Sequence, residues 1–522
     1  MADRAQPLGA GLRLGAGGAA ALVAALAALP LAAVLARGGG IAALGPADWA
    51  AVRFTLVQAT ASAAISLALA VPVARALARR RFPGRGLLVT LLGAPFILPV
   101  IVAVMGVLAI FGRGGFLNDA FAALGLGRIS IYGIGGVILA HVFFNLPLAV
   151  RLLLQGWRAI PAERFRLAAA LGFGPAEIAR HLERPMLRAL APGIFATIFL
   201  LCLTSFAVVL TLGGGPRATS VELAIYQAFR FDFDLSRAAA LASLQFALCA
   251  LTALAATRLA VPSAFGTGLD RPVARWDAGA PALRALDTAL IGLAALFLAA
   301  PLAAVVLSGA PRLAGLPAPV WQAAARSVVV SAASTLLTLT LALPIALAVA
   351  KKRRGRILES VGMLPLATSA LVTGTGLFLI LRPLASPATL ALPVTVAVNA
   401  VMALPFALRS LIPAARDLEE GYGRLAQSLG MSGAARLRLL TLPRLRRPLG
   451  FAAGLTAALS MGDLGVIALF ADADRATLPL QLYRLMGAYR MADAAGAAVL
   501  LLALSLAAFW ILDRGGRADA GT

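Results

Sequence analysis

Few side chains in this sequence have the types and spacing that enzymatic chemistry requires. Paired carboxylates, a nucleophile beside a general base and the Gly-x4-Gly-Lys-Ser/Thr motif are all missing from its 522 residues, so we predict neither catalysis nor ATP hydrolysis by the chain itself. Its histidines and cysteines lack the spacing of metal ligands, and we predict no metal site and no bound cofactor. One ionisable residue stands out, because Asp463 lies inside a long apolar segment.

A carboxylate within a bilayer costs about 2.5–3.5 kcal/mol on insertion scales, so Asp463 needs a physical reason. Ser460 lies almost one helical turn before it, and an internal repeat pairs Asp463 with Ser205, which follows Thr204. One hypothesis is that these four residues line a path through the membrane. The alternative is that Asp463 pairs with a neighbouring group, or that the small polar residues pack helices together.

The composition predicts a membrane protein. The chain is 61% hydrophobic and 13% charged with a mean hydropathy of +0.91, whereas a soluble protein carries about 25% charged residues. Apolar runs of the ~20 residues that a helix needs to cross a bilayer recur along the chain. The predicted fold class is therefore an all-α polytopic membrane protein with about twelve transmembrane helices. The predicted spans are 17–36, 54–78, 87–111, 131–153, 190–211, 238–261, 288–310, 327–350, 359–381, 389–408, 449–470 and 493–513.

The basic residues predict the orientation. If the N-terminus is inside, the inner segments hold 33 of the 46 Lys and Arg residues, which places both termini in the cytoplasm and the chain in the inner membrane. This distribution also explains the net charge of +24 without nucleic acid, so no nucleic-acid partner is predicted. We interpret 17–36 as an uncleaved first span, and 262–287 as a polar linker rich in Gly and Pro.

The two halves of the chain form an internal repeat. At an offset of 258 residues Pro147 matches Pro405 and Pro185 matches Pro443. Each half has six predicted spans, so the two six-helix repeats share one orientation and are parallel. The predicted division is an N-terminal span and outer loop (1–53), a first half (54–261), a linker with the seventh span (262–326), a second half (327–513) and a cytoplasmic tail (514–522).

A basic loop between two spans is the clearest repeated feature. In both copies a glycine and a proline lie thirteen positions apart. A short helix over 164–171 that ends in a left-handed glycine, followed by a helix that starts at Pro175, predicts a helix–turn–helix elbow. The alternative is an ordinary basic connector. The matched residues are Arg166, Ala168, Leu171, Gly172, Leu182 and Pro185 in the first copy, and Arg424, Ala426, Leu429, Gly430, Leu440 and Pro443 in the second.

Both loops resemble the Glu-Ala-Ala-x3-Gly-x9-Ile-x-Leu-Pro coupling motif of permease subunits in bacterial ABC importers, with Arg166 and Arg424 in place of its glutamate. The segments 141–147, 205–216 and 222–227 are similar to the fused permeases of thiamine importers. The resemblance implies a type I ABC importer permease fold. It also implies two separate ATPase subunits that grip the elbows and use ATP, and a periplasmic substrate-binding protein.

The same resemblance implies that the small-molecule substrate is thiamine or one of its phosphates, and that Asp463 favours the cationic thiazolium ring. Glu222 is placed on the outer side of the membrane, either as a contact for a substrate-delivering protein or as a solvated loop charge. Iron(III) or another small solute stays open as the substrate. An ion-coupled secondary transporter would share the span number, although Asp463 is the only good candidate for its coupling carboxylate. A membrane-embedded enzyme or scaffold is disfavoured by the paired elbows.

Overall fold

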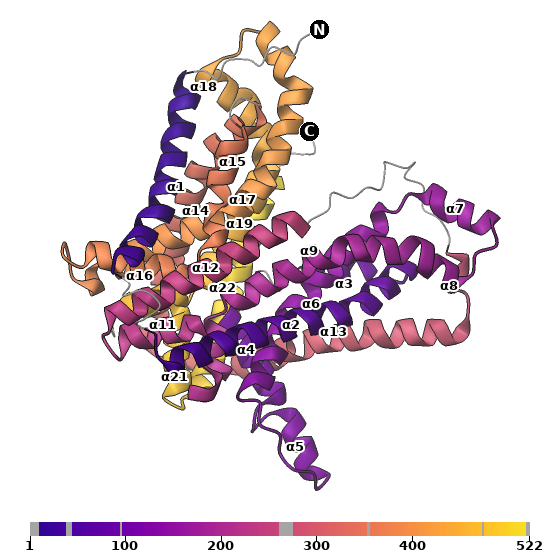
Figure 1. The fold of residues 1–522 in the computed structure, drawn as a ribbon, viewed down its shortest axis with the longest axis horizontal. Coiled ribbons are helices and arrows are strands. Elements are labelled where there is room, and N and C mark those ends of the chain that lie inside the picture. Colours follow the sequence, from indigo (N-terminus) through magenta and orange to yellow (C-terminus); the bar gives the residue numbers. More distant parts are fainter. Residues whose placement is uncertain are drawn as a thin grey trace.

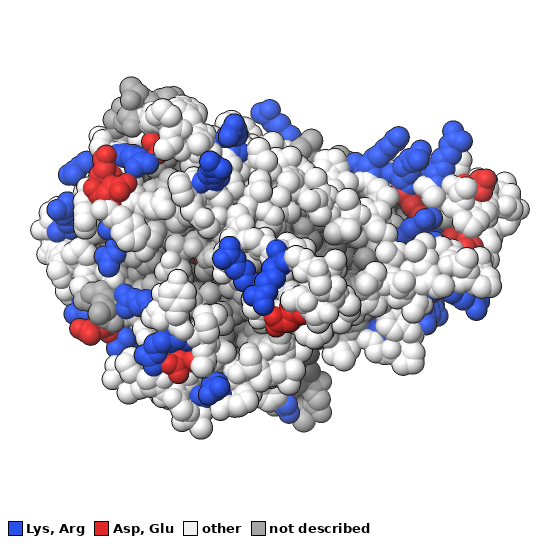
Figure 2. Space-filling model, turned by 90° about the horizontal axis from the view of Figure 1, so that it is seen from below, with Lys and Arg blue, Asp and Glu red and all other residues white. Residues whose placement is uncertain are grey.

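The computed structural model describes residues 10–37, 44–93, 97–259, 275–351, 355–471 and 474–517. Every regular element within these ranges is a helix, and eleven helices are long and apolar enough to cross a membrane. A bent pair, Gly355–Ala367 and Ala370–Leu381, provides a twelfth span. The predicted all-α polytopic fold is confirmed. Figure 2 shows that charged side chains gather in separate groups on a mostly uncharged surface.

The helices of the first half are numbered along the chain from α2. They are α2 (Pro46–Arg79), α3 (Arg85–Leu91), α4 (Val100–Phe111), α5 (Phe116–Ala123), α6 (Ile134–Ala159), α7 (Ala162–Ala170), α8 (Pro175–Ile178), α9 (Arg184–Leu203), α10 (Ala207–Leu212), α11 (Val221–Arg230) and α12 (Leu235–Leu259). The first span, α1 (Ala10–Arg37), precedes them, and the seventh, α13 (Pro281–Gly309), follows.

The second half begins with α14 (Ala318–Ala350). It continues with α15 (Gly355–Met363), α16 (Ala370–Leu381), α17 (Pro387–Ser428), α18 (Gly433–Arg436), α19 (Leu442–Met461), α20 (Gly465–Phe470), α21 (Leu478–Gly487) and α22 (Met491–Arg517). Figure 1 shows two lobes that diverge from a shared base, one ending at α7 and α8 and the other at α18.

The two halves exchange their first spans. Helix α1 packs on α14 and α16 of the second half, whereas α13 packs on α2 and α4 of the first (Figure 1). Glycines at matched positions make this possible: a Cβ on Gly106 of α4 would collide with the carbonyl oxygen of Pro301 in α13, and a Cβ on Gly376 of α16 with that of Pro30 in α1. Only glycine allows backbones to approach this closely.

The predicted spans 190–211, 359–381 and 449–470 each contain a helix break that hydropathy did not predict. Helix α9 ends at Leu203 before α10, α19 ends at Met461 before α20, and the chain bends by 93° between α15 and α16. Side chains at the breaks bond to nearby backbone: Asp463 Oδ1 accepts from the Gly465 N–H (3.2 Å), and Ser369 Oγ accepts from the Val372 N–H (3.0 Å). Such local bonds compete with the helical ladder.

The predicted polar linker is only partly described, because 260–274 lie outside the described residues. Its remaining part is not a solvated connector. A short 3-10 turn, Trp276–Ala278, packs against the first half, and α13 already begins at Pro281. Asp277 and Ala278 are buried there. Asp287 at the end of this segment pairs with Arg79 and Arg80 of the first half, whereas Asp277 pairs with Arg275 of the segment itself.

Candidate translocation pocket and coupling elbows

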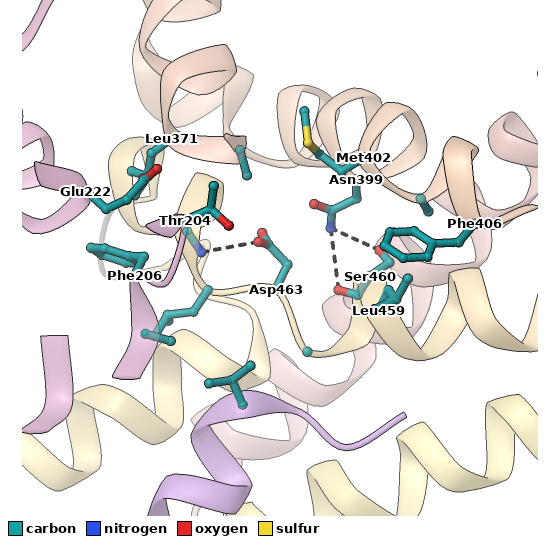
Figure 3. A pocket seen from close by; sticks show the side chains of 17 residues that line it. Thr204, Phe206, Glu222, Leu371, Asn399, Met402, Phe406, Leu459, Ser460 and Asp463 are labelled. Carbon is teal, nitrogen blue, oxygen red and sulfur yellow. Dashed lines mark hydrogen bonds between the residues drawn. The ribbon is translucent and has the colours of Figure 1, made fainter. Parts of the chain in front are cut away.

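A cavity of about 280 Å³ lies where the broken helices of the two halves meet (Figure 3). Its polar lining comes from Thr204 and Glu222 of the first half and from Asn399, Ser460 and Asp463 of the second. Phe206 and Phe406 are among its aromatic and apolar lining residues, and the lining includes no Lys or Arg. The volume is close to the lower end of the ~300–1,000 Å³ range of small-molecule pockets.

Asp463 occupies the break between α19 and α20 and faces the cavity (Figure 3). Its Oδ1 accepts the Gly465 N–H, but its buried Oδ2 has no hydrogen-bond donor among the described residues. No basic residue in the lining neutralises it. An acceptor that is buried without a donor is unusual, because its desolvation is then uncompensated. This arrangement suits a ligand that brings a positive charge or a donor.

Glu222 is a second carboxylate in the same cavity, and its predicted place on the outer surface is wrong. It lies in the first turn of α11, is 1% exposed, and its Oε1 accepts from Gln245 Nε2 at 3.0 Å. A single acid within the apolar run 221–226 is the signal that singled out Asp463, and it could have identified Glu222 too. The two acids come from opposite halves of the chain.

Of the four predicted path residues, Thr204, Ser460 and Asp463 line the cavity and Ser205 does not. Ser205 Oγ instead lies 2.8 Å from Nε2 of the buried His141, whose Nδ1 lies 3.3 Å from Ser62 Oγ. In the second half Asn399 holds the position that His141 holds in the first. Its Nδ2 donates to Ser460 Oγ at 3.0 Å and thereby fixes one wall of the cavity (Figure 3).

The two elbows have the same backbone at their tips. Gly172 has φ of 68° and Gly430 has φ of 64°, the left-handed conformation that glycine adopts at little cost. The following N–H groups reach back over the glycine, from Phe173 to the Ala168 carbonyl (2.9 Å) and from Met431 to the Ala426 carbonyl (2.8 Å). This is the Schellman arrangement that ends a helix.

The twelve residues of the repeated loops match pair by pair in exposure. The arginines, the glycines and the prolines are exposed in both copies, Ala168 and Ala426 are buried, and Leu182 and Leu440 are half-buried. Leu171 is 61% and Leu429 is 66% exposed. One turn before each lies another exposed leucine, Leu167 or Leu425. Each tip therefore presents the same apolar pair, a feature typical of protein contact surfaces.

A π-helical segment follows the tip in each copy, Ala179–Glu183 in the first and Leu437–Thr441 in the second. The two segments hold matched positions at the offset of 258. Short π segments are rare and often occur at functional sites. The repeat therefore extends from the tip through the return to the membrane-spanning helices α9 and α19.

Comparison with known proteins decides the family. No family model matches the chain. The chain is 43% identical to the thiamine transport system permease protein ThiP of Brucella abortus over 490 aligned residues. The aligned region covers 92% of this chain and 90% of the relative. The ThiP protein of Escherichia coli is 43% identical over 484 residues, 89% of each chain. The chain belongs to the thiamine transport system permease family.

The permease also resembles a shorter relative. The molybdenum transport system permease protein ModB of Azotobacter vinelandii is 32% identical over 170 residues, which is 32% of this chain but 74% of the relative. The resemblance to the fused permeases of thiamine importers is confirmed, as is the type I ABC permease fold. The chain is a multi-pass transport permease subunit.

A network of buried charges holds the first elbow of the permease against the end of the linker. Glu183, 2% exposed, forms ion pairs with Arg75 (2.7 Å) and Arg275 (3.2 Å). The Arg275 guanidinium also binds both oxygens of Asp277 at 2.7 Å and stacks 4.7 Å from the Phe165 ring. Burial opposes ionisation of Asp277, but Arg275 more than offsets it, so the pKa of Asp277 lies below its usual value.

Two further contacts complete this linker strap, which we define as residues 275–278 with Asp287. Trp276 Nε1 donates to the Phe173 carbonyl at the elbow tip (3.1 Å). Asp287, fully buried, bridges Arg79 (2.9 Å) and Arg80 (2.7 Å) at the end of α2. These pairings could not be predicted from one sequence, because Arg275 lies 92 positions from Glu183 and Asp287 lies 208 positions from Arg79.

The second elbow is supported differently. Helix α17 runs without a break from its membrane-spanning part to the tip. Glu419 on α17 pairs with Arg436 of α18 at 2.6 Å, and the Arg444 guanidinium lies 4.4 Å from the Tyr422 ring centre. Thr441 takes the position that Glu183 holds in the first elbow. No counterpart of the linker strap is found among the described residues of this elbow.

Proposed function

We propose that this permease imports thiamine across a bacterial inner membrane, in a complex with two ATPase subunits and a periplasmic substrate-binding protein. The observation that carries the proposal is the matched pair of elbows, whose tips agree in backbone conformation and in the exposure of every repeated residue. A surface presented twice suits a partner present in two copies. The excess of basic residues in the elbow-side segments supports a cytoplasmic position for the elbows and both termini.

The proposed mechanism converts ATPase closure into movement of the two lobes. Each ATPase subunit contacts the exposed leucines of one elbow. ATP favours the arrangement in which the tips are close together, and hydrolysis releases it, because only a difference in contacts between two states can shift their populations. The cavity lies between the halves at broken helices, where binding sites of transporters with repeated halves are commonly found.

The lining of the cavity favours an organic cation. Glu222 and Asp463 supply negative charge, and Phe206 and Phe406 supply aromatic faces that attract a cationic ring. The thiazolium of thiamine has this chemistry. A pyrophosphate group would meet two carboxylates without a basic residue in the lining, so we expect thiamine itself to pass more readily than its phosphates.

The coupling part is tested by uptake of labelled thiamine into proteoliposomes that contain the permease, its ATPase and its binding protein. Gly172→Trp and Gly430→Trp should each abolish ATP-driven uptake at an unchanged level of permease, because a bulky side chain strains the left-handed tip. Gly292→Trp is the control, because Gly292 lies in α13 away from the elbows with no atom within 4 Å of its Cβ position. Normal transport by both elbow variants would show that the elbows do not couple.

A secondary carrier would be revealed by the same vesicles. Uptake that persists without the ATPase and collapses with the proton gradient would replace the ATP-driven mechanism. The pocket is tested by Glu222→Gln and Asp463→Asn, each of which should reduce thiamine uptake about tenfold or more, since one charge in a dry site is worth ~1.4 kcal/mol or more. Ser205→Ala serves as the matched control, because Ser205 does not line the cavity.

A further inference from the structure

A second and larger cavity, of about 1050 Å³, lies beside the second elbow. It is a groove over α19, bordered by α14 on one side and by the end of α22 on the other. We call it the basic groove. The residues that define it are Leu339, Arg438, Leu442, Pro443, Arg444, Arg446, Arg447, Leu449, Gly450, Ala453, Leu512, Gly515 and Gly516.

The groove has one charged end and one apolar end. All four of its charged lining residues are arginines, and all four are exposed. They gather at the elbow end of α19, where Arg446 Nε also donates to the Gly515 carbonyl at 3.0 Å. Leu339 marks the other end. It lies eleven residues before α14 ends at Ala350, a rise of about 16 Å along the helix.

A close helix crossing forms the wall between α19 and α22. A Cβ on Gly450 would lie 2.7 Å from the Leu512 carbonyl oxygen, and one on Gly516 would lie 2.7 Å from the Arg446 carbonyl oxygen. Neither glycine can carry a side chain without moving the backbone of its neighbour. The crossing therefore fixes how closely α19 and α22 approach beside the groove.

The matched positions in the first half do not form the same basic groove. At the offset of 258, Met186 stands for Arg444, Ala189 for Arg447 and Pro192 for Gly450. Met186 is fully buried, where Arg444 is exposed. Arg180 and Arg188 match Arg438 and Arg446, and Arg184 stands at the position of Leu442, so the first half holds three arginines at these positions without the glycine of the crossing. The basic groove belongs to the second half.

We propose that the basic groove binds an anionic phospholipid from the leaflet on the elbow side of the membrane. The phosphate lies among Arg438, Arg444 and Arg447, and an acyl chain lies along the apolar floor toward Leu339. Basic pockets between transmembrane helices on the cytoplasmic side recognise anionic headgroups. A free phosphate or nucleotide would use the arginines but would leave the apolar end of the groove empty, so the shape favours a lipid.

Such a lipid would support the second elbow. Arg438, Leu442 and Pro443 belong both to the groove and to the chain that returns from the elbow tip. A bound phosphate neutralises repulsion among four arginines at this point and fixes the start of α19. The position of the leaflet rests on the orientation given under the proposed function, but binding itself does not depend on transport or on an ATPase.

The test uses the whole purified permease, delipidated in detergent, and native mass spectrometry with dioleoyl phosphatidylglycerol. Phosphatidylcholine with the same chains and inorganic phosphate are the comparison ligands. We expect retention of phosphatidylglycerol over phosphatidylcholine, and a weakening of about fivefold for each arginine removed. Arg444→Met with Arg447→Ala installs the first-half residues. The control is Arg180→Ala with Arg188→Ala, which removes two arginines from the first half.

Three results would overturn the proposal: equal retention of the two lipids, no loss of retention in the Arg444→Met, Arg447→Ala variant, or an equal loss in the control. Stabilisation by inorganic phosphate alone, to the same degree as by the lipid, would show an anion site without an acyl chain. If the double variant does not accumulate, Leu339→Trp replaces it, because it fills the apolar end and keeps every charge. That variant should lose the lipid, and unchanged retention would contradict the proposal.

Failure of this proposal is distinguishable from failure of the proposed function. Lipid retention is measured on the isolated permease, so it can succeed even if the elbows do not couple to an ATPase. Conversely, Gly172→Trp should abolish uptake but leaves every residue of the groove in place, so lipid retention by that variant should be unchanged. The two measurements therefore vary independently.

Discussion

The two elbows share a tip and differ in what holds it. Both tips turn at a left-handed glycine and expose the same leucines. In the first half Pro161 separates α6 from α7, and the linker strap holds the elbow from outside. At the position of Pro161 the second half has Glu419, which lets α17 continue to the tip and pairs with Arg436.

The repeat therefore preserves the surface offered to a partner and not the way in which that surface is supported. A proline disfavours the helical conformation of the residue before it, and Ile160 is extended here, so the first elbow is not an extension of α6. Its support must come from elsewhere, and the linker that follows the first half supplies it. The second elbow is instead a continuation of α17, supported by the Glu419–Arg436 ion pair and the contact of Arg444 with the Tyr422 ring.

The largest loss of stability is expected when a proline is placed in the second elbow at the position that Pro161 holds in the first. Glu419→Pro should destabilise the permease by about 3 kcal/mol or more, because it interrupts α17 and also removes the partner of Arg436. Pro161→Ala should change stability by less than about 0.5 kcal/mol, because α6 has already ended there. Thermal denaturation of the detergent-solubilised variants measures both. Similar losses in the two variants would remove the distinction between the elbows.

Breaking the linker strap comes next. Glu183→Ala should cost about 3 kcal/mol, near the lower end for a broken buried ion pair because Arg75 is partly exposed. Thr441→Ala at the matched position should cost about 1 kcal/mol. The same denaturation measurement applies, with hydrogen exchange at 162–174 as a local readout. If Thr441→Ala exposes its elbow as much as Glu183→Ala exposes the first, the strap does not support the elbow.

Replacement of the tip glycine should have the same effect in both elbows. Gly172→Ala and Gly430→Ala each force an alanine into a left-handed conformation, at a cost of about 1–2 kcal/mol. We expect both variants to bind the ATPase more weakly by the same factor, about tenfold. Binding of each purified variant to the ATPase checks this. A loss confined to one variant would mean that the tips are not equivalent docking points.

The smallest effect is expected from pH. The folded pKa of Asp277 lies below its usual value, so its ion pair with Arg275 contributes stability above the unfolded pKa of about 3.9 and is lost only as the pH falls through the lower, folded value. Hydrogen exchange of 275–280, corrected for the intrinsic rate, should therefore not change between about pH 8 and about pH 6. Opening of the strap in that window would contradict the assignment.

Much of this architecture could be predicted from the sequence. Apolar runs located the twelve spans, and the Gly–Pro spacing located both elbows together with the left-handed glycines. The helix breaks were missed, because hydropathy measures only whether a segment is apolar. The breaks are accompanied by hydrogen bonds from nearby backbone N–H groups to Asp463 and Ser369, and hydropathy carries no information about such bonds.

Contacts between distant segments could not be predicted from one sequence. Glu222 was assigned to the surface because it follows a predicted span, yet α11 folds back so that its first turn closes the cavity. The linker strap was predicted to be part of a polar linker, because its contacts with the first half are also made between distant segments. Its polar composition describes the residues correctly, but only the fold shows that its Arg275 pairs with Glu183 and its Asp287 with Arg79 and Arg80.

The exchange of α1 and α13 has a consequence for how the protein can be made. Each lobe is completed by a helix encoded in the other half, with Pro30 seated on Gly376 and Pro301 on Gly106. A chain cut within 262–274 would give two fragments, and each would carry the helix, α1 or α13, that packs on the other fragment. Neither fragment should mature alone, whereas the two produced in the same cell should complement each other and restore a working permease.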